Sequence, residues 1–383
     1  MDSVEPDGVW AGLVGQDRVV ATLRRAVAGG RHAMSHAWLF TGPPGSGRSN
    51  AARAFAAALQ CPDGGCGQCN ACLTALSGAH PDVTIARIET LSIKVDDVVE
   101  LVRHAAMFPA MGRYQVVVIE DADRVTERAA DMLLKSIEEP AQRTVWILCA
   151  PTPDDVVVTI RSRCRQVALT TPSEQAIAWL LSHRDGVEPD AAAFAARVSQ
   201  GHIGRARALA TNEDARARRA AVLSLPSQLT SLGSCLEAAQ RAVEAATAEA
   251  EAVTAELDQR ETAELARAVG FGQPGARRGA AAAMRDLEDE QKARAKRLQR
   301  DSLDRLLTEF TAFYRDVLAV QVAPGVRLVN EDVGGSVTRL AKATTPEATV
   351  AKLDAILACR QALETNVAPL LAMEALMIAL RSG

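Results

Sequence analysis

A glycine-rich loop between an apolar run and a helical stretch is the feature that most constrains this chain. Leu39–Thr41 leads into the octapeptide GPPGSGRS at 42–49. The octapeptide follows the G-x-x-x-x-G-K-[ST] template of phosphate-binding loops, except that arginine replaces lysine. Glycines let backbone N–H groups approach the phosphates, and the N-terminus of the following helix adds favourable partial charge. The candidate phosphate-binding residues are Gly42, Gly45, Gly47, Arg48 and Ser49.

Arginine at the lysine position affects phosphate binding and ATP hydrolysis differently. Lysine presents a compact charge to the β- and γ-phosphates, whereas the guanidinium of Arg48 is a larger planar fork. We therefore interpret the segment as a degenerate nucleotide-binding loop, with ATP or ADP as its candidate ligand and with hydrolysis by this chain lost or weakened. An ordinary glycine-rich turn is the alternative.

Short apolar runs alternate with helical patterns over residues 1–170. All runs except 83–88 are continuously apolar, which is typical of parallel strands buried on both faces. This alternation predicts an α/β domain built on a parallel sheet. The runs cover 37–40, 83–88, 116–119 and 145–149, and the helical patterns cover 17–28, 49–59, 94–107 and 126–138.

Two carboxylates, Glu120 and Asp121, follow the third apolar run. In nucleotide hydrolases, acids at such a strand end hold Mg²⁺ and orient the attacking water, usually with aspartate first. The reversed order here shifts each carboxylate by about a methylene, and displacements of ~1 Å are costly at a reacting centre. We assign both residues to the degenerate nucleotide site; a buried strand with a polar, helix-capping end is the alternative.

Four cysteines gather in one short segment, at Cys61, Cys66, Cys69 and Cys72. Their C-x4-C-x2-C-x2-C spacing can close a tetrahedral shell around Zn²⁺, and the glycines between them permit tight turns. In a reducing compartment such clustering favours metal over disulfides. We expect a structural zinc site at 61–72; an iron–sulfur cluster and free thiols are the alternatives.

Two arginines outside these motifs are further candidates for phosphate or nucleotide contacts. Arg163 lies in a basic segment that follows Thr152 and the last apolar run, and Arg205 lies near the start of a helical segment. Arginines at alternating positions are rarely all buried. Arg163 could therefore reach a phosphate on a neighbouring subunit, as arginine fingers do. A solvated basic loop is the alternative.

From about residue 171 the strand signals end and helical patterns take over. Ser173 is placed to cap the first of these helices. The segment 236–320 is rich in Ala, Glu, Arg and Leu and predicts two long helices joined by a turn at 270–279. Its leucines are sparse, so we expect a largely exposed hairpin whose simplest role is a structural arm or spacer.

Charge and hydropathy narrow the class of protein. Lys and Arg number 43 against 47 Asp and Glu, which gives a net charge of −4 over 383 residues and excludes a uniformly basic surface. The apolar runs are far shorter than the ~20 residues of a membrane span. The acidic start of the chain lacks an apolar signal core. We therefore expect a cytoplasmic protein with no membrane partner.

Together these motifs resemble the bacterial clamp-loader AAA+ family. The resemblance covers roughly residues 1–212, and the order and spacing of the motifs agree. It implies an AAA+ P-loop domain with the cysteine knuckle over 1–170, a helical lid over 171–212, and a C-terminal helical collar over 213–383 that includes the hairpin. The matching segments are SHAWLFTGPPGSGR (35–48), the four-cysteine knuckle, IKVDDVVELV (93–102), GRYQVVVIEDADRVTERAADMLLKSIEEP (112–140), TIRSRC (159–164) and GHIGRARAL (201–209).

The resemblance also implies a function and partners. It identifies Arg163 with a finger that acts in trans on the ATP of an adjacent motor subunit, and Thr152 and Arg205 with sensor residues. A chain with the knuckle and TIRSRC but no loop lysine is similar to a non-motor subunit of a DNA polymerase holoenzyme. It would assemble with tau/gamma and delta subunits and act with the sliding clamp on primer–template DNA. The alternatives are an ATP-hydrolysing motor subunit and a zinc-containing nucleic-acid adaptor.

Overall fold

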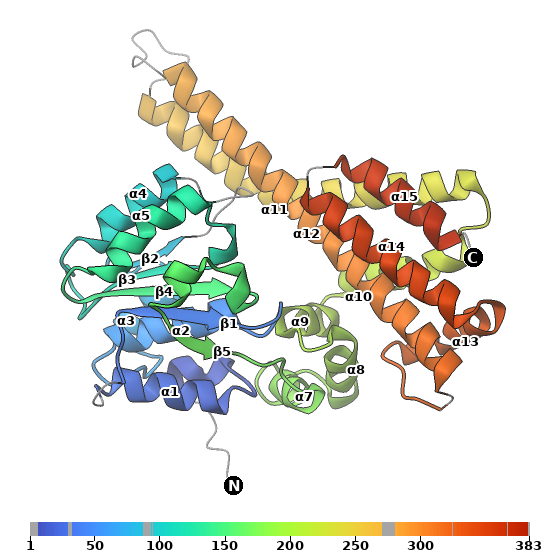
Figure 1. Ribbon diagram of the computed structural model, residues 1–383, viewed down its shortest axis with the longest axis horizontal. Helices are drawn as coiled ribbons and strands as arrows, with labels where there is room; N and C mark the ends of the chain where they lie inside the picture. Colours follow the sequence, from blue (N-terminus) through green and yellow to red (C-terminus); the bar gives the residue numbers. More distant parts are fainter. Residues whose placement is uncertain are drawn as a thin grey trace. The chain divides into compact units, whose positions relative to one another are not determined.

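The computed structural model describes residues 7–29, 33–86, 93, 95–269, 280–323, 325–365 and 367–381. Contacts between Cα atoms divide the chain into two compact units, Met1–Thr211 and Asn212–Gly383. The first unit contains a β-sheet with helices on both sides, and the described part of the second is helical (Figure 1). No described helix is long and apolar enough to cross a membrane.

The sheet of the first unit has five strands in the order β2-β3-β4-β1-β5. Every neighbouring pair runs parallel, which confirms the predicted α/β class. β1 and β4 lie in the middle of the sheet, so their carboxyl ends and that of β3 meet along one edge. The strands are β1 (Ala37–Thr41), β2 (Val83–Ala86), β3 (Gln115–Ile119), β4 (Thr144–Ala150) and β5 (Arg165–Ala168).

Both faces of this sheet are covered, which explains why its central strands are continuously apolar. β1, β3 and β4 are buried at every position. Alternate side chains enter two cores: Trp38 and Phe40 pack with Phe55 on one face, and Leu39 enters the core on the other. The first face is covered by α1 (Asp17–Val27), α2 (Arg48–Gln60) and α3 (Asn70–Ser77), and the second by α4 (Val95–Ala105), α5 (Glu127–Glu138) and α6 (Val158–Arg161).

The sequence prediction missed one strand and two helices of this unit, β5, α3 and α6. β5 begins with Arg165 and Gln166, so it lacks an apolar run. It is a strand because it pairs with β1, with Trp38 opposite Arg165. β2 is described as far as Ala86, and residues 87–88 of the predicted strand and residue 94 of the predicted helix lie outside the described residues.

Three helices complete the first unit after the sheet. Ser173 caps the first of them as expected, because its Oγ accepts a hydrogen bond from the N–H of Ala176 at 3.1 Å. These helices are α7 (Glu174–His183), α8 (Pro189–Ser199) and α9 (Ile203–Thr211).

Two long helices, α11 (Leu232–Val269) and α12 (Ala280–Val322), pack against each other in the second unit. They start before and end after the predicted bounds 236–320, and the predicted turn at 270–279 lies outside the described residues. Arg294 on α12 forms ion pairs with Asp258 and Glu261 on α11, each at 3.0 Å. Polar contacts of this kind hold together a stretch that lacks a continuous apolar stripe. The other helices are α10 (Glu213–Ser224), α13 (Gly334–Ala343), α14 (Pro346–Glu364) and α15 (Pro369–Arg381).

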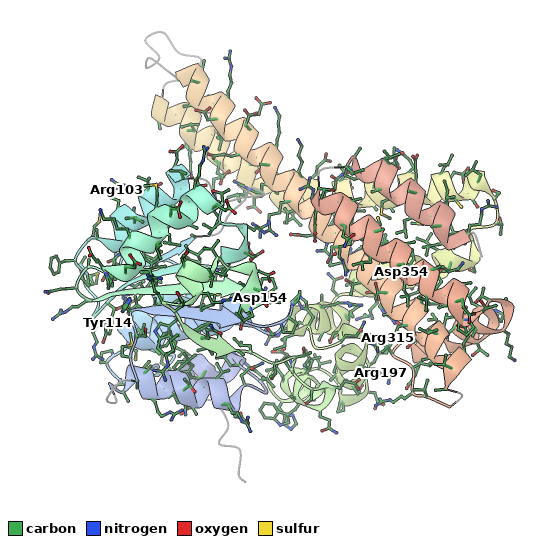
Figure 2. All side chains as sticks on the ribbon, in the orientation of Figure 1. Arg103, Tyr114, Asp154, Arg197, Arg315 and Asp354 are labelled. Atoms are coloured by element: carbon green, nitrogen blue, oxygen red, sulfur yellow. The ribbon has the colours of Figure 1, made fainter. Side chains whose placement is uncertain are left out.

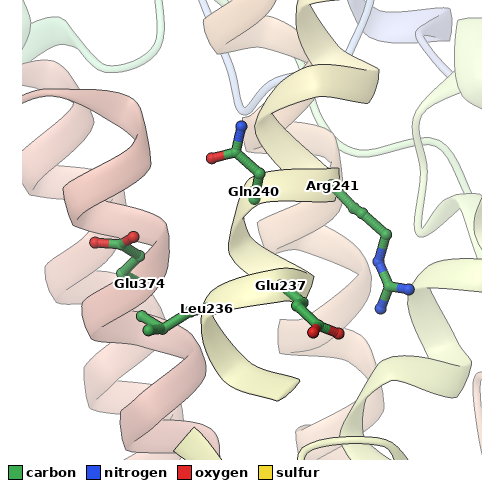
Figure 3. Close-up of a pocket in the computed structure, with 5 residues that line it drawn as sticks. All are labelled: Leu236, Glu237, Gln240, Arg241 and Glu374. Carbon is green, nitrogen blue, oxygen red and sulfur yellow. The ribbon is translucent and has the colours of Figure 1, made fainter. Parts of the chain in front are cut away.

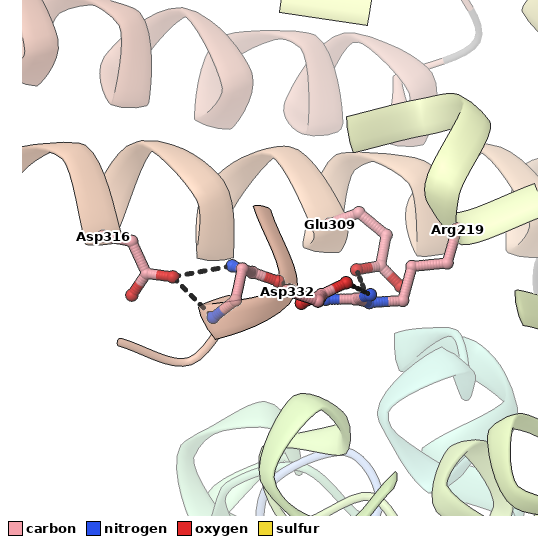
Figure 4. A network of polar contacts seen from close by, with 5 residues as sticks. Arg219, Glu309, Asp316 and Asp332 are labelled. Carbon is pink, nitrogen blue, oxygen red and sulfur yellow. Dashed lines mark hydrogen bonds and ion pairs between the residues drawn. The ribbon is translucent and has the colours of Figure 1, made fainter. Parts of the chain in front are cut away.

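A buried polar network anchors a loop of the second unit to α10 and α12 (Figure 4). Arg219 on α10 donates hydrogen bonds to Asp332 at 2.6 Å and to Asn330 at 2.7 Å. Glu309 on α12 lies 3.6 Å from the same guanidinium. Asp316, also on α12, accepts hydrogen bonds from the backbone and side-chain nitrogens of Asn330. Each buried charge therefore has an opposite charge or a hydrogen-bond donor beside it.

An open pocket between α11 and α15 is lined by side chains of mixed character (Figure 3). Leu236, Glu237, Gln240 and Arg241 come from α11, and Glu374 comes from α15. None of these residues belongs to a motif found in the sequence, and both charge signs are represented. The predicted site residues all lie in the first unit.

Candidate nucleotide site and metal centre

The glycine-rich loop connects β1 to α2, and close contacts require two of its glycines. Gly42 and Gly45 have φ angles of 154° and 83°. A Cβ atom on Gly42 would lie 2.6 Å from the carbonyl oxygen of Leu169, and one on Gly45 would lie 2.7 Å from Cα of His202. Only glycine fits these positions, so the loop lies directly against the end of β5 and the start of α9.

Gln16 fastens the loop to the segment that follows β5. Its Nε2 donates a hydrogen bond to the carbonyl oxygen of Thr170 at 2.6 Å and a longer one to that of Ser46 at 3.4 Å. Its Oε1 accepts a hydrogen bond from the N–H of Thr170 at 3.2 Å. The side chain is buried, so these contacts replace water. The sequence analysis did not single out Gln16.

Arg48 begins α2, and its guanidinium turns back onto the loop. Its Nη1 donates a hydrogen bond to the carbonyl oxygen of Gly42. Ser49 follows in the first turn of the helix. The cation at the lysine position therefore contacts the backbone of its own loop.

Glu120 follows β3 and forms an ion pair with Arg53 on α2. Nε and Nη2 of Arg53 both donate to Oε1 of Glu120, at 2.9 and 2.7 Å. The two side chains are 14% and 15% exposed, so the pair is only weakly screened by water. Arg53 is a second residue that the sequence analysis missed.

The charged residues beside the loop surround one buried thiol in β4. Burial raises the pKa of Cys149, and charges on Glu120, Arg48, Asp121 and Arg53 also act on it. The structure thus brings the predicted residues Arg48, Glu120 and Asp121 together near the carboxyl ends of β1, β3 and β4.

Thr152 lies next to the loop because the N–H of Gly42 donates a hydrogen bond to the carbonyl oxygen of Pro151 at 3.0 Å. It is exposed, and it caps the short 3-10 turn Pro153–Asp155. Its backbone N–H and its hydroxyl both donate to the carboxylate of Asp155, at 2.8 and 2.9 Å. A sensor role for Thr152 stays a prediction.

Arg205 lies in the first turn of α9, the helix that starts against the loop. His202, which contacts Gly45, accepts a hydrogen bond at Nδ1 from the backbone N–H of Arg205 at 3.1 Å. His202 therefore caps α9 and sets the distance between this helix and the glycine-rich loop. Its proximity to the loop is a tertiary contact that no sequence pattern indicated.

Arg163 follows α6 and forms an ion pair with Glu138 of α5, with Nη2 and Oε1 at 2.5 Å. Its Nη1 donates to the carbonyl oxygen of Thr159 at 2.9 Å. Both partners of the ion pair are 40% exposed. In the same segment Arg161 pairs with Asp154, which is labelled in Figure 2. Two arginines of the basic segment are thus held by acids of the same chain, and Arg163 is the more exposed of the two.

The four clustered cysteines converge between α2 and α3. All four Sγ atoms lie within 4.8 Å of one another, and Sγ of Cys61 is 3.7 Å from those of Cys66 and Cys69. These separations are far too long for disulfides. A tetrahedron with Zn–S bonds of ~2.3 Å has edges of about 3.8 Å. The observed spacing therefore fits a tetrahedrally coordinated ion.

Backbone N–H groups point at the same sulfur atoms. Each of the four Sγ atoms accepts a hydrogen bond from a backbone N–H, at 3.4 to 3.5 Å. Burial opposes ionisation of Cys61, but N–H groups of Cys66, Gly65 and Asp63 outweigh it and lower its pKa to about 6. Burial raises the pKa of Cys72. Because bound metal requires thiolates, the loop already favours the ligand form at Cys61.

The cysteine loop also holds the start of the first unit. The N–H of Val9 donates a hydrogen bond to the carbonyl oxygen of Gly65 at 3.1 Å. A Cβ atom on Gly8 would lie 2.2 Å from that same oxygen. Trp10 is buried beside the loop, at 1% exposure. The 3-10 turn Gly8–Gly12 therefore depends on the conformation of the cysteine loop.

Comparison with known proteins gives one family match within the first unit and relatives that match between 40% and 96% of the chain. Residues 15–173 match a family described as "DNA polymerase III, delta subunit". The delta' subunit of Bacillus subtilis is 27% identical over 96% of this chain and 97% of its own length. The delta' subunit of Pseudomonas aeruginosa is 38% identical over 40% of this chain and 48% of its own. This chain is therefore similar to clamp-loader subunits of DNA polymerase III.

Gamma/tau subunits match a shorter part of this chain than the delta' subunit of Bacillus subtilis does. The gamma/tau subunit of Mycobacterium tuberculosis is 36% identical over 40% of this chain, and the match spans 27% of that longer protein. Among solved structures, a gamma subunit-related protein of Thermotoga maritima covers 94% of this chain and 98% of its own, with 16% identity and a TM-score of 0.46.

Proposed function

We propose that this chain is a delta-prime-type, non-motor subunit of the DNA polymerase III clamp loader. The observation that carries the proposal is Arg48 at the lysine position, in a chain that aligns end to end with a delta' subunit. In this role it hydrolyses no ATP, assembles with tau/gamma and delta subunits, and acts in the cytoplasm. Together they place the sliding clamp on primer–template DNA.

We assign Arg163 to the ATP site of a neighbouring subunit. Its ion pair with Glu138 is 40% exposed on both sides, and exposed ion pairs contribute only ~0–1 kcal/mol. The guanidinium can therefore exchange this partner for a phosphate at little cost. Charge supplied in trans to a transferring phosphoryl group is worth roughly 10³–10⁵ in rate for the GTPases. The contribution of this chain is thus electrostatic stabilisation, not turnover.

The test is ATP hydrolysis by the reconstituted complex with tau/gamma, delta, clamp and primed DNA. Arg163→Ala should reduce stimulated hydrolysis, and Arg48→Ala should not. Arg161→Ala is the matched control, because it removes a second ion-paired arginine of the same segment. If Arg48→Ala abolishes hydrolysis and Arg163→Ala does not, the chain is a motor subunit, as its similarity to gamma/tau proteins would also allow.

We assign the cysteine cluster to structural Zn²⁺. Four thiolate ligands leave no coordination position open, which suits a structural rather than a catalytic ion. Elemental analysis of the purified chain should give about one zinc per molecule and no iron. Iron with inorganic sulfide would instead identify an iron–sulfur cluster, and metal-free protein with four reactive thiols would contradict both assignments.

The remaining predicted residues are assigned to the degenerate nucleotide site of this chain. Gly42, Gly45, Gly47 and Ser49 would surround phosphate. Thr152 and Arg205 lie on segments that border the same loop. Titration of the chain with a fluorescent ADP analogue tests whether nucleotide binds at all.

A further inference from the structure

Arg53 belongs to no motif, yet it holds the acid that a nucleotide site would use for metal. Glu120 stands at the carboxyl end of β3, where Mg²⁺ is held in nucleotide hydrolases. Both donors of Arg53 converge on its Oε1, at 2.7 and 2.9 Å. The glutamate side chain is one methylene longer than that of the usual aspartate. Here its carboxylate meets Arg53 on α2.

The charges around this point nearly balance without an added ion. Arg48 and Arg53 supply two positive charges, and Glu120 and Asp121 supply two negative ones, all acting on the buried thiol of Cys149. Mg²⁺ demands near-ideal octahedral coordination by oxygen at about 2.0–2.1 Å. A carboxylate oxygen shared by two N–H donors is a poor ligand, and an adjacent guanidinium repels a second cation.

We propose that Arg53 takes the place of the divalent cation in this chain's own phosphate loop. By holding Glu120 it excludes Mg²⁺, so the loop is a site for phosphate free of metal. This inference rests on the proposed nucleotide ancestry of the loop and is independent of Arg163. The proposals for Arg53 and for Arg163 can fail separately. The role of Arg53 is tested on the isolated chain, and that of Arg163 on the reconstituted complex.

The direct probe is Mn²⁺, whose binding to the full chain can be followed by electron paramagnetic resonance with and without ADP. The wild-type chain should bind no Mn²⁺ beyond that held by free ADP. Arg53→Met keeps the length of the side chain but releases Glu120, and Glu120→Asp withdraws the carboxylate from Arg53. Both variants should gain a Mn²⁺ site. The same pair is made in the Arg48→Lys background, where the loop matches the phosphate-binding template.

Three control variants distinguish the release of Glu120 from a general disturbance of the fold. Arg53→Lys keeps a cation and should bind no Mn²⁺, and Glu120→Gln removes the metal ligand and should bind none. Arg207→Met breaks another ion pair of the first unit, with Asp185, and should leave metal binding unchanged. Thermal unfolding of each variant verifies that it is folded, and Glu120→Asp preserves the test if Arg53→Met does not fold.

The fluorescent-ADP titration gives a second readout. Mg²⁺ should change ADP affinity less than about twofold in the wild type and at least about tenfold in the released variants, a coupling in the range typical of linked sites. Undetectable ADP binding by the wild type, with or without Mg²⁺, overturns the proposal, because it leaves no metal-free phosphate site. ADP binding by the wild type that depends on Mg²⁺ also overturns it. The proposal is wrong as well if Arg53→Met and Glu120→Asp bind no metal in either the wild-type or the Arg48→Lys background.

Discussion

Helix α2 has a glycine-containing loop at each end, and the two loops differ in the charged and metal-ligating side chains beside them. At its carboxyl end, four sulfur atoms lie within 4.8 Å of one another and each accepts a backbone N–H. At its amino end, Arg48 and Arg53 contact the loop and Glu120 of the same chain. The spacing of the four sulfurs suits a bound cation, whereas the glycine-rich loop has arginine side chains of its own chain beside it. The two ends of one helix thus differ in where positive charge would come from.

Removing a cysteine ligand should produce the largest effect. Cys72→Ala cannot close a four-sulfur shell, and loss of a structural metal removes a contribution that is ~10 kcal/mol or more in zinc-finger peptides. We expect loss of the bound metal and a decrease of about 5 kcal/mol in the free energy of unfolding. Metal analysis and urea unfolding measure both.

The same variant should release the N-terminal turn, seen as faster hydrogen exchange of the Val9 N–H that donates to Gly65. Cys149→Ala, which truncates a buried cysteine outside the cluster, is the control and should keep the metal. If Cys72→Ala and Cys149→Ala had the same free energy of unfolding, the cysteine loop would not depend on a bound ion. The contrast between the two loops would then be wrong.

Gly45→Ala should have the next largest effect and reports on the phosphate loop. Its Cβ would enter the space of His202, 2.7 Å from Cα, at a φ of 83°. Strain and overpacking together predict a loss of roughly 3 kcal/mol in the free energy of unfolding. Gly47→Ala is the matched control, because φ is 91° and nothing lies within 4 Å of its Cβ position. Equal losses in the two variants would show that His202 does not press on the loop.

Asp82 tests the surroundings of the cysteine end of α2. It is buried, and its carboxylate accepts N–H groups of Ala110, Met111 and Gly112 at 2.6, 2.8 and 2.5 Å. This loop leads to Tyr114 (Figure 2), whose carbonyl oxygen accepts a hydrogen bond from Gln60, the last residue of α2. Asp82→Asn places an amide donor against backbone N–H groups. It should lower the free energy of unfolding by about 2 kcal/mol at neutral pH.

The effect of this substitution should depend on pH. Burial pushes the pKa of Asp82 upward, but the three N–H groups outweigh burial and lower it. A lowered folded-state pKa stabilises the fold above the unfolded value of about 3.9, and this stabilisation is lost as pH falls through the folded-state pKa. The difference between wild type and Asp82→Asn in urea unfolding should therefore shrink below about pH 4. A difference that stays constant to pH 2 would assign the loss to geometry alone.

Arg163→Ala should have the smallest effect on the isolated chain. Its ion pair with Glu138 is 40% exposed on both sides, so we expect a change of less than about 1 kcal/mol in the free energy of unfolding. Thermal and urea unfolding measure it. A larger loss would make Arg163 a structural residue, and reduced hydrolysis in the reconstituted complex could then no longer be attributed to a missing charge.

Local features of the first unit could be predicted from the sequence. The strands β1, β3 and β4 are apolar because both of their faces are buried, the glycine-rich loop lies between a strand and a helix, and Ser173 caps α7. The four cysteines were also predictable as a group, since ligands within one short turn must lie close together. In each case the residues that decide the structure are neighbours in the chain.

Other features were decided by contacts between distant segments. β5 is a strand because β1 pairs with it, although it begins with Arg165 and Gln166. Arg53 meets Glu120 across 67 positions of the chain, and Gln16 meets Thr170 across 154. No pattern of spacing encodes such meetings, because they depend on how strands and helices pack. The sequence by itself thus determined where the glycine-rich loop and the four cysteines lie, and the tertiary structure decided which charges are held by partners within the chain.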